Sequence, residues 1–370
     1  MQLTSIKKIS YVQLAVLFVA SRLFSEAMSF PLANTEYGMQ RFAVILTAYV
    51  ILFIQYIPLI YISKKYPGES AIGIITDRNK VLGWIYAILL MISVLISSIS
   101  SMCRMKFYAS STIFGQAPDY LLIILPLLAC AFAVWKGIQA TARSGVIFAA
   151  VFVAFLILIS VSTWNMFDVN WLYLNFIDNK DSFLSEVLEQ IGSNSEIIFF
   201  AALTEHVSEK SQRTVYWYIP AVMLILELMH LLEMLVLGPF LGSANFPFFT
   251  VSALSNIVLF QRLDGIDVAV WTLMCIVKIS LAMLCIRTAF NRLAGKNAGI
   301  ISALAGLVII AAVSMMFGGN SDFVITITGI LTCGIPMITC GIVFPIIAII
   351  TAKLKPNKNS KGAKANENGA

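Results

Sequence analysis

Apolar stretches separated by short charged connectors repeat along the whole chain. We count about ten of them, each close to the roughly 20 residues that an α-helix needs to cross the hydrocarbon core of a bilayer. They lie near residues 11–32, 42–62, 81–102, 119–135, 145–163, 188–203, 216–237, 266–290, 298–317 and 323–350. The pattern predicts an all-α polytopic membrane protein with about ten transmembrane helices.

The sixth stretch, LEQIGSNSEIIFFAAL at 188–203, contains a polar interruption. Small and polar residues of this kind suit helix ends and loops better than a lipid-facing helix interior. Unpaired backbone groups survive at membrane depth only where protein or a wet cavity satisfies them, so we predict a discontinuous transmembrane helix. The alternative is an external loop followed by an ordinary span. The interrupting residues are Gly192, Ser193, Asn194, Ser195 and Glu196.

A break of this kind would present both hydrogen-bond donors and acceptors to one cavity. The first half-helix ends in free carbonyls, and Ser193, Asn194 or Ser195 can cap the second half, whose amides point into the gap. The positive end of the second half-helix favours a carboxylate.

The first stretch also has a polar side, on which Arg22 and Glu26 lie four residues apart with serines beside them. Transporters built as an inverted five-plus-five repeat break the first helix of each half at the binding site. We therefore predict such a repeat with helices one and six broken. The alternative for the first span is a straight helix in which an Arg22–Glu26 pair holds the bundle together.

Further polar groups fall within predicted spans three and eight. Ser97 and Ser101 lie four residues apart and are candidates for lining the cavity, although close helix packing is a common role for such serines. Lys278 falls near the bilayer centre and needs a partner or water. We expect it to pair with Glu26 or to occupy a cation site of the kind transporters use.

Span seven carries Glu227, His230 and Glu233 on one broad face. Ionisable groups at this depth suggest function, and a histidine titrates near neutral pH, so a proton relay is one interpretation. A polar face turned toward neighbouring helices is the leading one. No further ligand cluster in the sequence supports a metal site.

Composition leaves no room for a separate soluble domain. The chain is 59% hydrophobic and 12% charged, with a mean hydropathy of +0.88. We predict one transmembrane domain over 1–352 and a disordered basic tail over 353–370 that contacts anionic membrane lipid. Nothing beyond this tail favours nucleic-acid binding.

Lysine and arginine are distributed asymmetrically between the two sides of the predicted bundle, and the richer side is expected to be cytoplasmic. Both chain termini are then cytoplasmic. The few basic residues expected on the outer side are Arg41, Arg104, Lys106, Lys180 and Arg262.

The sequence carries no sign of enzyme chemistry. It has two histidines, and no serine elbow, HExxH motif or CxxC pair accompanies them or the six cysteines. We therefore expect neither catalysis nor a cofactor or metal.

Several segments resemble the B subunit of endospore nutrient germinant receptors. The longest, FPFFTVSALSNIVLFQRLDGIDVAVWTLMCIVKIS, covers 246–280, and ISYVQL at 9–14, YPGES at 66–70 and SEIIFF at 195–200 follow the family order. The matching positions in the longest segment are Pro247, Phe260, Arg262, Leu263, Asp264, Trp271 and Lys278. The chain departs from the family in the middle of span one, where it reads SRLFSEAM and lacks a glycine.

The resemblance implies a relative of amino acid permeases in the spore inner membrane, which binds a nutrient and acts with a larger A subunit and a lipoprotein C subunit. Candidates for ion or proton coupling are Glu26, Glu196, Glu227, His230 and Glu233. Carried onto this chain, the nutrient site would comprise Arg22, Ser25, Ser97, Ser101, Gly192, Ser193, Asn194, Lys278, Leu281 and Ala282.

Two functions fit these expectations. The first is a receptor subunit that binds a small nutrient, an amino acid or similar solute, and helps trigger germination. The alternative is a proton- or sodium-coupled amino acid transporter. Both require the same cavity.

Overall fold

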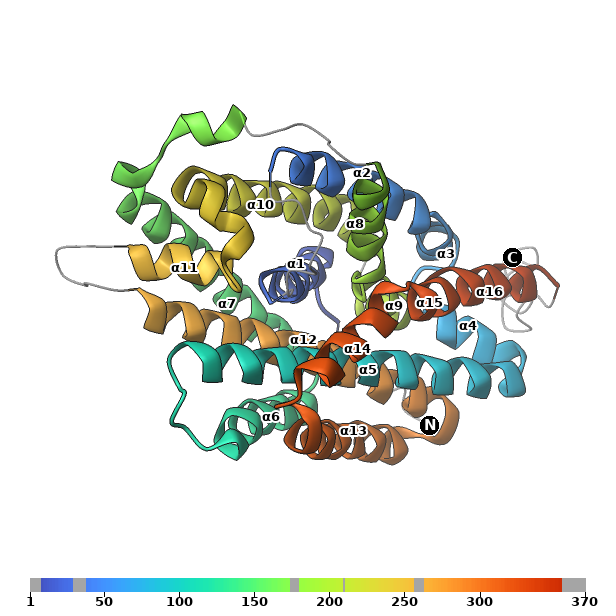
Figure 1. Cartoon of the computed structure of the whole chain (residues 1–370). Coiled ribbons are helices and arrows are strands. Elements are labelled where there is room, and N and C mark those ends of the chain that lie inside the picture. Colours follow the sequence, from blue (N-terminus) through green and yellow to red (C-terminus); the bar gives the residue numbers. More distant parts are fainter. Residues whose placement is uncertain (1–7, 29–37, 174–179, 209, 256–262, 355–370) are drawn as a thin grey trace.

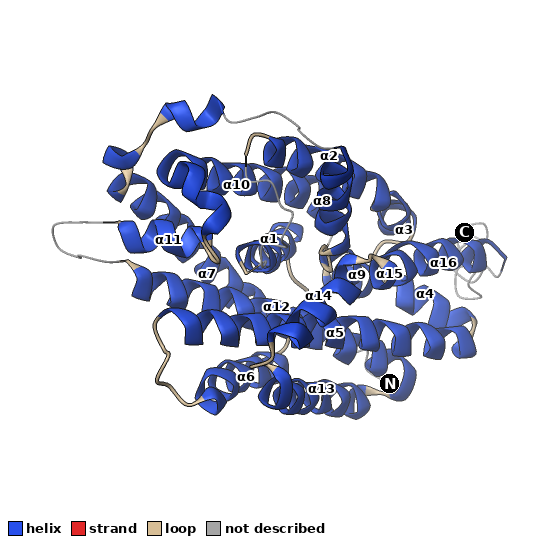
Figure 2. Cartoon of the chain, viewed as in Figure 1, coloured by secondary structure: helices blue, strands red, loops and turns tan. Residues whose placement is uncertain are grey.

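The computed structural model describes residues 8–28, 38–173, 180–208, 210–255 and 263–354. These residues are almost entirely helical, and Figure 2 shows short loops between the helices. The first half contains α1 (Tyr11–Ala27), α2 (Gln40–Gln55), α3 (Ile57–Lys65), α4 (Ala71–Arg78), α5 (Lys80–Thr112), α6 (Asp119–Lys136) and α7 (Ile138–Ser162). The short helices η1 (Trp164–Met166) and η2 (Val169–Tyr173) follow.

The second half continues in the same way. Its α-helices are α8 (Lys180–Gly192), α9 (Glu196–Leu203), α10 (Arg213–Leu237), α11 (Pro247–Leu254), α12 (Asp264–Ala294), α13 (Lys296–Phe317), α14 (Ser321–Thr332), α15 (Ile335–Ile338) and α16 (Phe344–Leu354). Single short turns are η3 (Thr204–His206), η4 (Gly238–Ser243) and the π-helix η5 (Thr339–Val343).

Eight helical stretches are long and apolar enough to cross a membrane. The 17-residue α1 and the interrupted pair α8–α9 correspond to predicted spans one and six and are not among these eight. The eight are Gln40–Lys65, Lys80–Thr112, Asp119–Lys136, Ile138–Ser162, Arg213–Ser243, Asp264–Ala294, Lys296–Phe317 and Asp322–Leu354. The chain is an integral membrane protein.

Helix α1 lies in the middle of the bundle, with α10 on one side and α12 on the other (Figure 1). α12 is the most buried of the long spans and also packs against α5, α6, α7 and α13. The two helices therefore form the centre around which the others are arranged.

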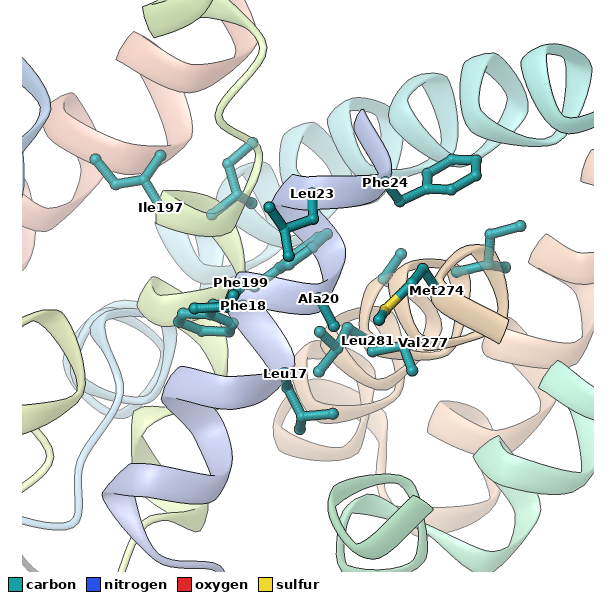
Figure 3. Close-up of a cluster of buried hydrophobic side chains, with 14 of the residues drawn as sticks. Leu17, Phe18, Ala20, Leu23, Phe24, Ile197, Phe199, Met274, Val277 and Leu281 are labelled. Carbon is teal, nitrogen blue, oxygen red and sulfur yellow. The ribbon is translucent and has the colours of Figure 1, made fainter. Parts of the chain in front are cut away.

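Apolar side chains hold α1 against its neighbours. Leu17 and Ala20 of α1 face Val277 and Leu281 of α12, while Phe18 lies beside Phe199 of α9 (Figure 3). In lipid, packing of this kind supplies much of the attraction between helices, because leaving water contributes little there. This contact fixes α1 between α9 and α12.

The first span differs from its predicted form. α1 runs without a break from Tyr11 to Ala27, so the prediction of an interruption near Arg22 and Glu26 is wrong for this part of the chain. Arg22 instead bonds to Glu26 one turn along the helix, as in the straight-helix alternative. The remainder of the predicted span, 29–32, lies outside the described residues.

The tenth span is interrupted where one continuous helix was expected. α14 ends before Cys333 and Gly334, and Gly334 takes φ +74°, a left-handed conformation that glycine adopts without steric cost. α15 then begins at Ile335, and Pro336 lies in its first turn, where the missing N–H leaves no helical bond unmade. The π-helix η5 follows immediately.

Span three is longer than predicted. α5 continues to Thr112, which places Arg104 and Lys106 inside a helix with their side chains buried, not in an external connector. Lys106 Nζ lies 2.7 Å from Asp119 Oδ2 at the start of α6, which explains how its charge is accommodated. The predicted tail from 355 onward, the B-subunit-like positions Phe260 and Arg262, and the side chain of Lys180 lie outside the described part.

Gly341 of η5 allows span ten to approach α9 closely. A Cβ built on Gly341 would lie 2.7 Å from Cγ2 of Ile197, so we expect Gly341→Ala to destabilise the protein by about 1–3 kcal/mol through overpacking. Gly329→Ala in α14 is the matched control, because a Cβ there meets no atom within 4 Å. Thermal unfolding of both variants in detergent provides the measurement, and equal melting temperatures would contradict the close contact.

Candidate ligand-binding site

The predicted break in span six is present and lies inside the protein. α8 ends at Gly192 and α9 begins at Glu196, and the amides of Ser193 and Asn194 still bond backward to Glu189 and Ile191 at 2.9 and 3.1 Å. Asn194 and Glu196 are fully buried. The alternative of an external loop is therefore wrong.

Asn194 connects the break to two tyrosines. Its Nδ2 donates to the hydroxyl of Tyr218 in α10 at 2.9 Å, and its Oδ1 accepts from the hydroxyl of Tyr56, at the end of α2, at 3.4 Å. The amide side chain is thus used to hold the loop in place. Asn194 does not line the cavity described next, although the sequence placed it in the ligand site.

A small cavity of about 20 Å³ lies beside the break. Its volume is enough for about one water molecule, so an amino acid would fit only after helices or side chains move apart. Six of the ten predicted ligand residues line it, together with three that were not predicted there. The nine are Ser25, Ser97, Ser101, Arg104, Gly192, Ser193, Ser195, Lys278 and Leu331.

Lys278 lines this cavity, and the carboxylate of Glu196 lies next to Lys278 but is not itself among the lining residues. Lys278 Nζ donates to Ser25 Oγ and lies 4.0 Å from Glu196 Oε1, which also accepts a 2.5 Å hydrogen bond from Ser21 Oγ. Glu196 Oε2 is buried without a hydrogen-bond partner among the described residues. Glu196 also lies in the first turn of α9, where the helix dipole favours a negative charge.

The expected Lys278–Glu26 pair is therefore wrong. Glu26 instead bonds to Arg22 at 3.0 Å, to Arg41, and to Gln190 Nε2 at 2.6 Å. Arg22 in turn donates to the Tyr49 hydroxyl at 2.9 Å. This network joins α1, α2 and α8, and neither Arg22 nor Glu26 lines the cavity.

Arg104 lines the cavity, whereas the sequence predicted it on the outer side of the bundle. Its Nη1 donates to the carbonyls of Ser25 and Met28 at 3.2 and 3.4 Å, at the end of α1. Its Nε and Nη2 both lie 3.2 Å from Ser100 Oγ. The signal that could have revealed it is its helical spacing from Ser97 and Ser101, which puts it on the same face of α5.

The remaining predicted residues lie elsewhere. Leu281 and Ala282 are buried in the packing between helices and do not line the cavity (Figure 3 shows Leu281). His230 Nε2 lies 3.1 Å from the carbonyl of Gly38, at the start of α2, and its Nδ1 lies 3.8 Å from Glu233. Glu227, on the same helix, is not a cavity residue either.

His230 fits the interpretation of a polar face on α10 turned toward a neighbouring helix, since its ring packs against Phe42 of α2. Among the residues that the structure describes, no three histidine, cysteine, aspartate or glutamate side chains are grouped to hold a metal ion.

A family model described as spore germination protein matches residues 8–324. This chain belongs to the spore germination protein family. The match includes the break in span six and Lys278, and of the residues that line the candidate site Leu331 lies beyond it. A search among curated proteins finds no match.

The fold has a counterpart among solved structures. A Na⁺-coupled sialic acid symporter in its substrate-bound, outward-open state superimposes with a TM-score of 0.59, over 88% of this chain and 77% of that one. The identity is 14%, so the likeness concerns the fold alone. Family and fold together indicate a permease-type membrane protein.

The Lys278–Glu196 pair predicts a measurable coupling. Removing one partner of a buried pair leaves the other charge uncompensated, so Lys278→Met and Glu196→Gln should each destabilise the protein, by up to about 3–5 kcal/mol. The double variant should lose much less than the sum, because neither charge remains. A double-mutant cycle of thermal or denaturant unfolding measures the difference, and strictly additive losses would contradict the pairing.

Proposed function

We propose that this protein is a nutrient germinant receptor subunit that binds a small amino-acid-like solute beside the break in span six and thereby helps to trigger spore germination. The observation that carries the proposal is the cavity itself. It joins the broken backbone to Lys278 and Arg104, with the carboxylate of Glu196 next to Lys278. Family membership supplies the connection to germination.

The two ends of an amino acid find complementary groups here. The ligand carboxylate would interact with Lys278, Arg104 and the amino-terminal end of α9, which favours negative charge. The ligand ammonium would face Glu196, whose Oε2 makes no hydrogen bond within the described structure, and the carbonyl end of α8.

Binding would also require a conformational change, and this suits a receptor. The cavity of about 20 Å³ is too small for an amino acid, and Lys278 is held by Ser25 of α1. A ligand that engages Lys278 would compete with this contact and shift the position of α1 relative to α12. A ligand shifts the equilibrium between two conformations only if it binds one of them more tightly than the other.

The second candidate is a proton- or sodium-coupled amino acid transporter. The observation that favours it is the shared fold with a Na⁺-coupled symporter. The same cavity would then open alternately to each side of the membrane.

We further propose a location and partners. The distribution of lysine and arginine supports cytoplasmic termini. The resemblance to B subunits supports the spore inner membrane, with a larger A subunit and a lipoprotein C subunit as partners.

Filling the cavity should weaken the nutrient response. Ser101→Leu adds a bulky side chain at a cavity-lining position of α5, and we expect at least a tenfold higher nutrient concentration to be needed for germination of a complemented deletion strain. Ser111→Leu is the matched control, because Ser111 is exposed near the end of the same helix. Protein levels in the spores must be equal.

Two results would count against the receptor. An unchanged response in Ser101→Leu would show that the cavity is not the nutrient site. Accumulation of an amino acid in proteoliposomes containing the purified protein, driven by a proton or sodium gradient, would favour the transporter instead.

A further inference from the structure

The four segments that resemble B subunits meet at one end of the bundle. The segment 66–70 ends at Ser70, directly before α4, and the segment 9–14 begins at Ile9, directly before α1. The segment 195–200 continues through α9 into η3, and the longest segment continues through α12 to Ala294. By the predicted orientation this end of the bundle faces the cytoplasm.

Glu205 of η3 joins three of these segments. Its side chain is buried, and its Oε2 accepts hydrogen bonds from Arg292 Nε and Nη2 of α12 at 3.1 and 3.0 Å. The same oxygen accepts from the hydroxyl of Ser70, the residue that caps α4, at 2.9 Å. Hydrogen bonds between charged groups are stronger than those between neutral ones. We name the bonded side chains of Ser70, Glu205 and Arg292 the inner lock.

Further hydrogen bonds hold η3 at the same place. His206 Nε2 lies 3.1 Å from Thr288 Oγ1 of α12, and Thr204 Oγ1 donates to the carbonyl of Glu69 at 3.3 Å. The amide of Ile9 donates to the carbonyl of His206 at 2.8 Å. The end of span six is therefore tied to α12, to the loop before α4 and to the segment before α1.

The inner lock acts on one side of the break through a continuous helical arm. α9 runs from Glu196 to Leu203, and η3 follows it without an intervening loop. At about 1.5 Å per residue, Glu205 lies about 14 Å from Glu196 along this arm. A tilt of α9 at the break would consequently move Glu205 further than Glu196, and the inner lock opposes such a tilt.

A cavity of about 510 Å³ beside the inner lock leaves space for this movement. Glu205 and Arg292 line it, together with Leu203 at the end of α9. It shares no residue with the small cavity beside the break. Close-packed protein interiors resist movement because displaced side chains meet other atoms, and a void on one side removes this resistance. Once the bonds of the inner lock break, η3 can move into the larger cavity.

We propose that Glu205 is a positioning residue of the nutrient site. Through the inner lock it holds α9, and with it Glu196 and the break, in the closed arrangement, and nutrient binding releases the inner lock as α9 tilts. This inference rests on the proposed function, because it takes the cavity beside the break as the site that opens. The movement of α9 can nevertheless be measured without any nutrient.

Maleimide labelling of the purified full-length protein in detergent tests the movement. Leu203→Cys reports it, because Leu203 is fully buried at the end of α9 and lines the larger cavity. The exposed native Cys333 is replaced by serine in every variant. We expect Glu205→Gln and Arg292→Gln each to raise the labelling rate at position 203 about fivefold, since the labelling rate follows the population of the open form.

Two comparisons connect the effect to the inner lock. The two substitutions weaken the same interaction, so the variant that carries both should label about as fast as either one alone. Asp77→Asn is the matched control, because Asp77 is an exposed carboxylate of α4 at the same end of the bundle and takes no part in the inner lock. It should leave the labelling rate unchanged.

Mass spectrometry of the labelled protein separates local opening from unfolding. Cys103 of α5 and Cys275 of α12 are native cysteines buried in the bundle. Unfolding would expose them to the maleimide as well, whereas a tilt of α9 leaves them unlabelled.

In spores, weakening the inner lock should increase sensitivity to nutrients. With a mixture of the common L-amino acids as the probe, we expect Glu205→Gln to give half-maximal germination at about a fivefold lower concentration, with the maximal rate unchanged. A variant that merely folded poorly would lower the maximal rate without increasing the sensitivity.

Three results would overturn the proposal: equal labelling at position 203 with and without the inner lock, equal acceleration by Asp77→Asn, or labelling of the buried native cysteines at the same rate. Faster labelling confined to position 203, combined with an unchanged nutrient response, would show that the inner lock holds α9 and would count against the proposed receptor function instead.

Discussion

Inside a membrane, backbone N–H and C=O groups that make no helical hydrogen bond must find partners within the protein itself. This requirement organises the structure around span six. The loop between α8 and α9 lies inside the protein, and Asn194 bonds to Tyr56 and Tyr218 on one side of it. On the other side the loop borders the small polar cavity. The cavity is lined from α1, α5, α12 and α14, whereas the tyrosines that bond to Asn194 belong to the end of α2 and to α10, so different helices hold the break and border the cavity.

Buried charges impose a second requirement, because each needs a partner of opposite sign or several hydrogen bonds. Two networks meet this need, and both include α1. One joins Ser21 and Ser25 to Glu196 and Lys278, and the other joins Arg22 and Glu26 to α2 and α8. The amide of Ile9, just before α1, also bonds to the carbonyl of His206 beyond α9 at 2.8 Å. Movement of α1 would consequently change contacts with α2, α8, α9 and α12.

This arrangement gives the proposed receptor a means of passing on a binding event. In the described conformation the site is closed around Lys278, and the fold is one that a sodium-coupled symporter uses for transport. Opening and closing of the same elements can serve transport or signalling, because function depends on the residues of the site and not on the fold alone.

The sequence by itself determined the membrane-spanning architecture and the break in span six, because hydrocarbon excludes both charges and unpaired backbone and so leaves a pattern that can be read locally. It also brought Ser25, Ser97, Ser101, Gly192, Ser193 and Lys278 to one site. Only the tertiary structure decided that Lys278 faces Glu196, that Arg104 enters the cavity and that span ten breaks at Gly334. Which groups a buried side chain contacts depends on the rotation and depth of its helix relative to the neighbouring helices. Glycines in an apolar run are compatible with either a continuous or a broken helix, so the sequence does not reveal the break at Gly334.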